Sequence, residues 1–245
     1  IVMLETGGPV EMPWIAKVPV LVQAWYPGQR GGEAIANILF GDVAPSGRLP
    51  ITFPARADQA PRPEPAGLAE LHAADARREA GDTANYGMTG GVAPFAVDYP
   101  EGAEVGYRWY AMKGAKPLFP FGYGLSYTSF TYANLNVQDG AALTVSFDVT
   151  NAGKRSGADV PQLYVQAKGS AGVNAWRLAG FDKVALSPGE TRRVTMTVDP
   201  RLIARFEEGA GWHLDGGNYA LTVGHHAGDM ALKAVARLDP VSLRP

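Results

Sequence analysis

The side chains of this sequence that could carry out acid–base chemistry are mainly glutamates. Hydrolysis of a glycosidic bond needs two carboxyl groups, about 5 to 5.5 Å apart in retaining enzymes and about 6.5 to 9.5 Å apart in inverting ones. Candidates stand near glycines, aromatic residues or the ends of predicted elements: Glu5, Glu11, Glu33, Glu101 and Glu104. No two of them form a pair that their spacing identifies. The sequence therefore supplies candidates for this chemistry and assigns no catalytic residue.

Each candidate also has a structural interpretation. Glu33 opens a predicted helix, where the helix dipole stabilises a carboxylate. Glu5 ends a predicted strand, and ligands of α/β sheets bind beyond the carboxyl ends of strands; we nevertheless prefer a buried structural carboxylate. Glu101 and Glu104 lie close to Arg108 in an aromatic segment. Pairing with this arginine explains them as well as sugar binding does.

Histidine and glycine patterns argue against other chemistries. His225 and His226 are adjacent, so on a strand they point to opposite faces and cannot share a metal. His72 and His213 stand alone, and the chain has no cysteine. The run GYGLS (122–126) lacks the third glycine of a dinucleotide-binding motif and the setting of a nucleophile elbow, and it predicts a tight aromatic turn. We expect no metal and no cofactor.

Bulk composition limits the partners of the chain. Its 245 residues include 22 basic and 24 acidic side chains, a net charge of −2 that offers no basic field to nucleic acid. No apolar run approaches the ~18 residues of a membrane span. The absence of cysteine leaves the compartment undecided, and a periplasmic or secreted location is compatible with it. We expect neither a nucleic-acid nor a membrane partner.

The first 55 residues predict the tail of an α/β sandwich domain. Residues 1–4 (IVML) are apolar on both faces, as in an inner strand of a covered parallel sheet. A second apolar strand is expected over 18–25, a helix over 30–42, and a strand-like run in LPITF (49–53). Because an inner strand needs neighbours on both sides, we expect the chain to be the downstream part of a larger protein.

The middle of the chain changes character twice. Residues 56–97 are rich in proline, alanine and charge without a sustained period, which predicts a linker or insertion with one short helix near 68–78. Residues 98–130 are dense in aromatic residues and glycine, a composition typical of irregular backbone packed against another surface. We expect the second segment to brace one domain against another.

Residues 131–245 predict an all-β, fibronectin type III-like (immunoglobulin-like) sandwich. ALTVSFDVTN (142–151) alternates apolar and polar residues, the pattern of a half-buried strand. Further strands are expected in VPQLYVQ, LAGFDKVAL, RRVTMTVD, NYALTVGH and MALKAVARL, about seven in all. Tyr219, at the start of one of them, suits a tyrosine corner. The predicted fold class is therefore mixed, an α/β tail followed by a β-sandwich.

Several strings, in this order, resemble the C-terminal part of glycoside hydrolase family 3. They are LETGGPVEMPW (4–14), AWYPGQRGGEAIANILFGDVAPSGRLPITFP (24–54), EGAEVGYRWY (101–110) and PLFPFGYGLSYTSF (117–130). DVTNAGKRSGADVPQLYV, LAGFDKVALSPGET and GNYALTVG resemble the fibronectin type III-like domain that ends many members. The resemblance covers nearly the whole chain except 56–97, which exceed the usual spacer. Ala111 departs from the family, which usually has an aspartate after GYRWY.

The resemblance implies an enzyme with a (β/α)8-type barrel, an α/β sandwich and this final domain, acting by retaining double displacement. Its nucleophile is an aspartate on the barrel, and its acid/base is a glutamate upstream of the GGPV turn. Neither motif is present here, so no catalytic residue is carried over. We expect the C-terminal portion of an exo-acting β-glucosidase, inactive alone, with the N-terminal catalytic part as its partner and a glycoside or oligosaccharide as substrate.

Alternatives remain open at this point. A β-xylosidase or exo-glucanase of the same family differs in tolerance of one hydroxymethyl group. A carbohydrate-binding or scaffolding module, one piece of a nicked enzyme and a homodimer are further possibilities. The candidate substrate-binding residues are Glu101, Arg108, Trp109, Tyr110 and Trp176, the last in a predicted loop. For Glu101, Arg108, Trp109 and Tyr110 we prefer an aromatic brace at a domain interface to sugar binding, and for Trp176 we likewise prefer a structural role to one at the rim of the active site.

Overall fold

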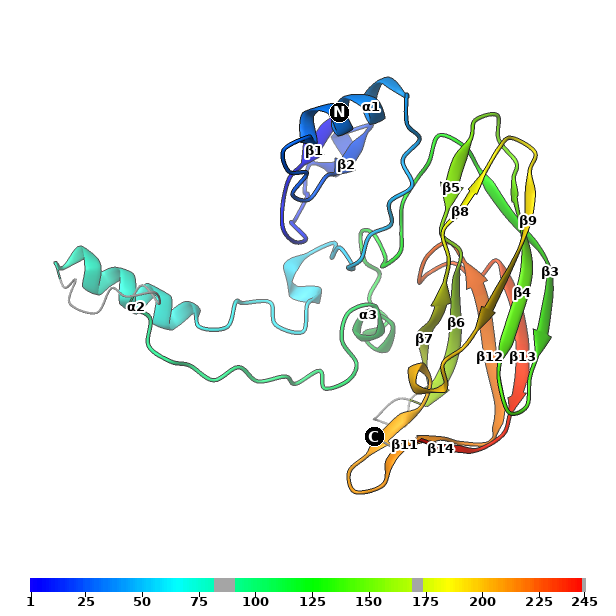
Figure 1. Ribbon diagram of the computed structural model, residues 1–245. Coiled ribbons are helices and arrows are strands. Elements are labelled where there is room, and N and C mark those ends of the chain that lie inside the picture. The colour runs from blue at the N-terminus through cyan, green and yellow to red at the C-terminus, as the bar shows by residue number, and fades with distance from the viewer. Residues whose placement is uncertain (82–90, 169–173, 244–245) are drawn as a thin grey trace.

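The computed structural model describes residues 1–81, 91–168 and 174–243. Figure 1 shows an N-terminal α/β part, an arm that projects from it, and a C-terminal β-sandwich. A short helix lies between the arm and the sandwich. This arrangement confirms the predicted fold class. None of the described helices is long and apolar enough to cross a membrane.

The N-terminal part is built on two short parallel strands and a helix. β1 (Val2–Leu4) pairs with β2 (Leu21–Gln23), the 3₁₀ turn η1 (Ile15–Lys17) lies between them, and α1 (Gly31–Phe40) follows. α1 ends because Gly41 adopts a left-handed conformation with φ of 83°, and its N–H donates to the Ile38 carbonyl. Within the described residues β1 has only β2 as a neighbour and is half-buried.

The predicted strand in LPITF is wrong. Phe53 forms only an isolated antiparallel bridge with Phe119. Its ring is 1% exposed and lies edge-on to Trp25 and to Phe119, at centroid distances of 6.2 and 6.5 Å. Only Thr52 and Phe53 of this run are buried, and Ile51 is 41% exposed. The run is not a strand because Phe53 packs between Trp25 and Phe119 and the described residues offer no sheet for it to extend.

The arm leaves and returns to the body between residues 60 and 99. After the 3₁₀ turn η2 (Ala57–Gln59), the chain forms α2 (Leu68–Glu79), which confirms the predicted short helix. The Phe95 ring of the returning segment lies so close to Gly67 that a β-carbon at Gly67 would collide with it. Gly67 also has a positive φ of 78°, so only glycine suits this start of the helix.

The aromatic segment contains a helix where irregular backbone was expected. α3 (Tyr107–Lys113) lies between two glycines with positive φ, Gly106 at 63° and Gly114 at 61°. These two glycines lie at the ends of the helix and not inside it. They therefore terminate the helix without preventing it from forming. The helix presents the residues of GYRWY to the sandwich and to the base of the arm.

The sandwich has two main sheets and two smaller ones. The first main sheet has the order β3 (Phe130–Gln138), β4 (Thr144–Asn151), β9 (Thr191–Thr197). The second has the order β13 (Leu232–Leu238), β12 (Gly217–Gly224), β6 (Gln162–Lys168), β7 (Asn174–Phe181). β5 (Gly157–Asp159) pairs with β8 (Val184–Leu186), and a small sheet has the order β10 (Arg205–Glu207), β11 (Gly211–Leu214), β14 (Val241–Leu243). The 3₁₀ turn η3 (Pro200–Leu202) precedes β10.

The core lies between the two main sheets. Residues of β4 are alternately half-buried and buried along its whole length, as predicted from the apolar–polar alternation. Phe147 of this strand pairs with Val194, and Leu221 pairs with Val165 in the facing sheet. The hydroxyl of Tyr219 donates to the Asp215 carbonyl over 2.7 Å, which confirms the tyrosine corner.

Two details of the sandwich differ from expectation. LAGFDKVAL is not one strand: β7 ends at Phe181 and β8 begins at Val184, because β7 pairs with β6 while β8 pairs with β5. Trp176 lies on β7, paired with Gln166, and not in a loop. The predicted loop is wrong at this position because glycine punctuation ends before Asn174.

Candidate functional site

The two glutamates of EGAEVGYRWY are buried beside arginines. Glu101 is 7% exposed, and one of its carboxylate oxygens lies 3.3 Å from Arg62 Nη2. Its other oxygen, Oε2, is buried and accepts no hydrogen bond from the described residues. The Arg62 guanidinium also lies over the Tyr99 ring, 4.8 Å from its centroid. Glu101 therefore ties the base of the arm to the aromatic segment.

Glu104 is more isolated than Glu101. It is 5% exposed, and its nearest cation is Arg108, with 3.9 Å between Arg108 Nε and Glu104 Oε2. Neither carboxylate oxygen accepts a hydrogen bond from the described part of the chain. A buried carboxylate without hydrogen bonds is costly. Among the buried carboxylates of the described residues, Glu104 alone has both oxygens without a hydrogen-bond donor.

Trp109 and Tyr110 are engaged in packing. Trp109 Nε1–H donates to the Gln59 carbonyl over 2.9 Å, and Lys113 Nζ lies 4.6 Å from the centroid of its ring. Tyr110 is 7% exposed, and burial raises the pKa of its hydroxyl. These contacts favour the brace over sugar binding for both residues.

Tyr107 attaches α3 to the sandwich. Its ring stacks on Phe121 at 5.0 Å and lies edge-on to Tyr164 at 5.8 Å. Its hydroxyl accepts a hydrogen bond of 2.8 Å from the Leu178 amide of β7. Burial is the largest cause of the raised pKa of Tyr107. Sequence reasoning did not single out Tyr107, although it is the second residue of the quoted GYRWY motif.

Trp176 belongs to the same side of the sandwich as α3. It lies two residues before Leu178, and successive residues of a strand alternate between faces, so the two share a face. Leu178 pairs with Tyr164, which contacts Tyr107. The structure therefore places four candidates, Glu101, Arg108, Trp109 and Tyr110, on or beside α3, with Trp176 on the face of β7 that α3 covers.

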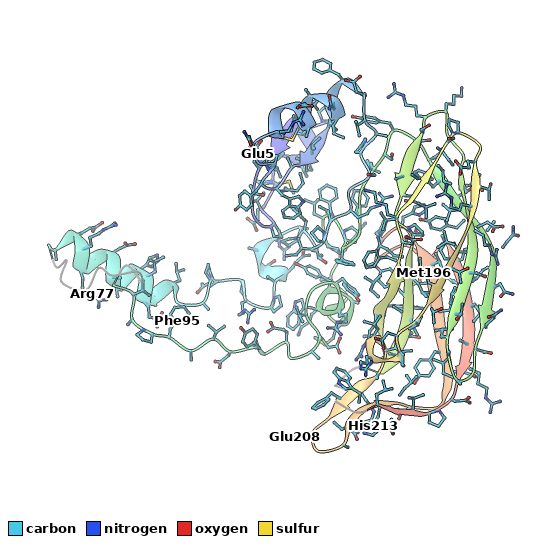
Figure 2. All side chains as sticks on the ribbon, viewed as in Figure 1. Glu5, Arg77, Phe95, Met196, Glu208 and His213 are labelled. Carbon is cyan, nitrogen blue, oxygen red and sulfur yellow. The ribbon has the colours of Figure 1, made fainter. Side chains whose placement is uncertain are left out.

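The other glutamates lie elsewhere. Glu5 is exposed on the N-terminal part, as Figure 2 shows, so the preferred interpretation as a buried carboxylate is wrong. Its side chain follows β1, which has too few neighbours here to cover it. Glu33 lies in the first turn of α1, as predicted, and accepts hydrogen bonds from Arg30. Glu11 accepts a hydrogen bond from the Ala57 amide.

A second buried polar group joins the N-terminal part to the sandwich. Asp159 is fully buried, and its carboxylate accepts hydrogen bonds from Arg48 Nη2 and from the Tyr132 hydroxyl, the latter at 2.6 Å. The His225 ring stacks on Tyr132 at 4.4 Å, and its Nδ1 donates to Asp229 Oδ2 over 2.7 Å. We call these five residues the Arg48–Asp159 network. No local pattern predicts this network, because its outermost members, Arg48 and Asp229, are 181 positions apart.

The electrostatics of this network follow from its burial. Burial, followed by the neighbouring Asp159 carboxylate, raises the pKa of Tyr132 far above its ordinary value. Burial also acts to raise the pKa of Asp229, but hydrogen bonds from the backbone and ring of His225 outweigh it and lower that pKa. Among the residues that the structure describes, no cluster of three histidines or carboxylates could hold a metal ion.

Comparison with known proteins decides the family. The family model described as "Glycosyl hydrolase family 3 C-terminal domain" matches residues 1–127, more than half of the chain, and the "Fibronectin type III-like domain" matches residues 159–227. The chain belongs to glycosyl hydrolase family 3. It is 41% identical to Beta-glucosidase B of Emericella nidulans over 98% of this chain and 28% of that protein. It is also 41% identical to a Beta-glucosidase of Rhizobium radiobacter, over 94% of this chain and 26% of that protein.

Solved structures of this family agree with the described fold. Beta-glucosidase 3B from Thermotoga neapolitana, determined in complex with glucose, is 33% identical with a TM-score of 0.81, over 99% of this chain and 32% of that one. DesR, a beta-glucosidase from Streptomyces venezuelae in complex with D-glucose, is 37% identical with a TM-score of 0.77, over 96% and 28%. The family 3 chain described here thus spans less than a third of the length of these relatives.

Proposed function

We propose that this chain is the C-terminal portion of a retaining, exo-acting β-glucosidase that removes terminal β-glucosyl residues from oligosaccharides or glycosides. The observation that carries the proposal is the similarity along almost the whole chain to proteins named beta-glucosidases, at about 40% identity. The division into residues 1–55, 56–97, 98–130 and 131–245 belongs to the same proposal. The catalytic carboxylates are proposed to lie on the N-terminal part of the enzyme.

Exposed apolar surface supports a large partner for residues 1–127. Among the described residues, fifteen of the twenty exposed large hydrophobic residues lie in this range, including Tyr26 at 79%, Phe40 at 85% and Leu125 at 70%. The sandwich, with nearly half of the chain, has the other five. Apolar side chains concentrated in this way mark an interaction surface. The N-terminal catalytic part of the same enzyme is the partner that the proposal assigns to it.

Within this function, the residues around α3 are proposed to support substrate binding from the edge of the site. Arg108 and Trp176 are half-buried, and Glu101 is buried with one carboxylate oxygen, Oε2, that accepts no hydrogen bond from the described residues. Trp109 and Tyr110 are proposed to act through the position of α3. The residues around α3 would have the same supporting role in a β-xylosidase or exo-glucanase. In this proposal, the residues that distinguish one sugar from another lie outside this chain.

The experiment compares the whole enzyme with the 245-residue chain on chromogenic β-glucosides and β-xylosides. We expect hydrolysis only by the whole enzyme, with a higher kcat/KM for the glucoside. Glu101→Gln and Glu104→Gln should leave kcat within a few-fold. If either variant abolished turnover at unchanged thermal stability, the proposed upstream location of the catalytic carboxylates would be wrong. A higher kcat/KM for the xyloside would favour the β-xylosidase.

Mass spectrometry of the intact protein, under native and then denaturing conditions, tests whether a companion chain is bound. A companion chain that survives only native conditions would show a nicked enzyme, held together by the surface of residues 1–127. A homodimer is also part of this proposal.

A further inference from the structure

The carboxyl ends of the two N-terminal strands lie side by side. β1 and β2 are parallel, with Leu4 opposite Gln23, and the Ala24 amide donates to the Leu4 carbonyl over 2.8 Å. Both strands therefore end at the same edge of their sheet. In α/β sheets, ligands bind beyond the carboxyl ends of the strands. We call the residues that follow the two strands, 5–8 and 24–28, the carboxyl edge.

The two turns of the carboxyl edge are fitted to each other. Gln23 Nε2 donates to the Thr6 carbonyl over 3.0 Å. The Tyr26 hydroxyl lies so close to Gly7 that a β-carbon at Gly7 would collide with it. Trp25, immediately before Tyr26, has a positive φ of 55°, which residues other than glycine rarely adopt. These contacts hold Tyr26 in a defined place at the surface.

Two side chains of the carboxyl edge are open to solvent. Glu5 is exposed, and its carboxylate forms no hydrogen bond or ion pair with the described residues. Figure 2 shows it on the side of the N-terminal part away from the sandwich. The other glutamates of residues 1–55, Glu11 and Glu33, both accept hydrogen bonds. Tyr26 is 79% exposed, so the edge presents one uncommitted carboxylate and one aromatic ring.

This pair of groups suits a sugar. Aromatic rings pack on the apolar faces of sugars, and a carboxylate accepts strong hydrogen bonds from hydroxyl groups. The carboxyl edge contains no basic side chain, so an anionic ligand would find no opposite charge there. A single carboxylate also gives a metal ion too few ligands. A neutral ligand with several hydroxyl groups is therefore the class that fits.

We infer that Glu5 and Tyr26 bind the leaving-group sugar of the glycoside substrate. Glu5 accepts hydrogen bonds from its hydroxyl groups, and the Tyr26 ring packs on its face. One carboxylate and one ring suit a loosely held group, and the leaving group is the part of a glycoside that varies in size. The inference rests on the proposed function, in which the choice of the terminal sugar stays with residues outside this chain.

Two substrates that differ only in their leaving group test the role of Glu5 in the whole enzyme. One is an aryl β-glucoside, and the other is a β-linked disaccharide of glucose. Glu5→Gln keeps the size of the side chain and removes its charge. It should raise KM for the disaccharide by about tenfold and leave kcat within about twofold, because a charge-assisted hydrogen bond is lost. KM for the aryl β-glucoside, whose leaving group has no sugar hydroxyl, should not change.

Three further variants complete the experiment. Glu33→Gln is the matched control, because it makes the same change on an exposed glutamate of the N-terminal part outside the carboxyl edge, and it should alter neither KM. Tyr26→Ala should raise KM for both substrates, since the ring packs on either leaving group. Tyr26→Phe keeps the ring and should leave both values unchanged. The melting temperature of the Glu5 variant should equal that of wild type, because Glu5 is exposed and without a described partner.

An unchanged KM for the disaccharide in Glu5→Gln would overturn the inference. So would an equal rise in KM for both substrates, because the aryl leaving group offers Glu5 no hydroxyl group. Wild-type activity separates this result from a failure of the proposed function. An active wild-type enzyme whose Glu5→Gln variant keeps both KM values would refute the inference alone, whereas a wild-type enzyme that hydrolyses neither β-glucoside would refute the proposed function and the inference with it.

Discussion

Replacing Arg48 tests the buried connection between the N-terminal part and the sandwich. Arg48 Nη2 donates to Asp159, and Arg48 Nη1 donates to the Gly124 carbonyl. The side chain of Arg48 is 10% exposed and that of Asp159 is 0% exposed. Arg48→Met keeps most of the apolar stem and removes the charge, so Asp159 keeps only the Tyr132 hydroxyl as a close hydrogen-bond donor.

The expected cost is large because the remaining charge has no access to water. Removing one member of a buried ion pair costs about 3 to 5 kcal/mol. With a urea m-value of about 2 kcal/mol/M, the unfolding midpoint should fall by roughly 2 M. Tryptophan fluorescence follows the transition, since the chain has tryptophans in both parts, such as Trp25 and Trp212.

The matched control is Arg56→Met. Arg56 pairs with Asp58 at 2.7 Å, but the two side chains are 72% and 61% exposed, so no measurable change is expected. Arg48→Met combined with Asp159→Asn should cost less than the sum of the single changes, because the double variant leaves no unpaired charge. A loss for Arg48→Met no larger than for Arg56→Met would refute the reasoning that this pair holds the two parts together.

Three further predictions concern single contacts. Tyr132→Phe should lower the free energy of unfolding by about 1.5 to 3 kcal/mol at pH 8. Because the folded state raises the pKa of Tyr132, the stabilisation by its hydroxyl is present below the unfolded pKa of about 10 and is lost as the pH rises above it. A stability difference between variant and wild type that stays constant up to pH 11 would contradict this. Gly122→Ala should lower the free energy of unfolding, measured by thermal unfolding, by about 2 to 4 kcal/mol, since φ is 82° and a β-carbon would collide with the Gln162 side chain. Gly32→Ala in α1 has open space around it and should instead raise the free energy of unfolding by about 0.5 to 1 kcal/mol. Trp109→Phe loses the hydrogen bond to Gln59 and should lower the melting temperature while kcat/KM of the whole enzyme stays within about twofold; a tenfold fall in kcat/KM at unchanged stability would show sugar binding.

The sequence allowed the fold class to be predicted because its periodicities are local. The alternation in β4, the helix in the arm and the tyrosine corner at Tyr219 each depend on residues within one or two turns or one strand. LPITF predicts a strand because it is apolar, but an apolar run does not reveal which elements pack against it. The sequence does not predict α3, because the glycines at its two ends are typical of a loop. The tertiary contacts of Tyr107, which attach the helix to the sandwich, cannot be seen in the sequence.

The candidate site was predictable only in part. Aromatic and charged residues at close spacing pointed to Glu101, Arg108, Trp109 and Tyr110, and the structure gathers them on or beside α3. The contacts of Glu101 with Arg62, of Trp109 with Gln59 and of Arg48 with Asp159 join residues that are 39, 50 and 111 positions apart. Such pairings depend on how the parts dock, which no local pattern of the sequence encodes.

The most direct test of the proposed function is reconstitution. The 245-residue chain is produced alone, the N-terminal catalytic part is produced alone, and a chromogenic β-glucoside is offered to each and to their mixture. The account predicts no hydrolysis by the 245-residue chain and activity in the mixture, because the catalytic carboxylates are proposed to lie on the N-terminal part. Hydrolysis by the 245-residue chain alone would contradict the account and would make Glu101 and Glu104 the first residues to replace.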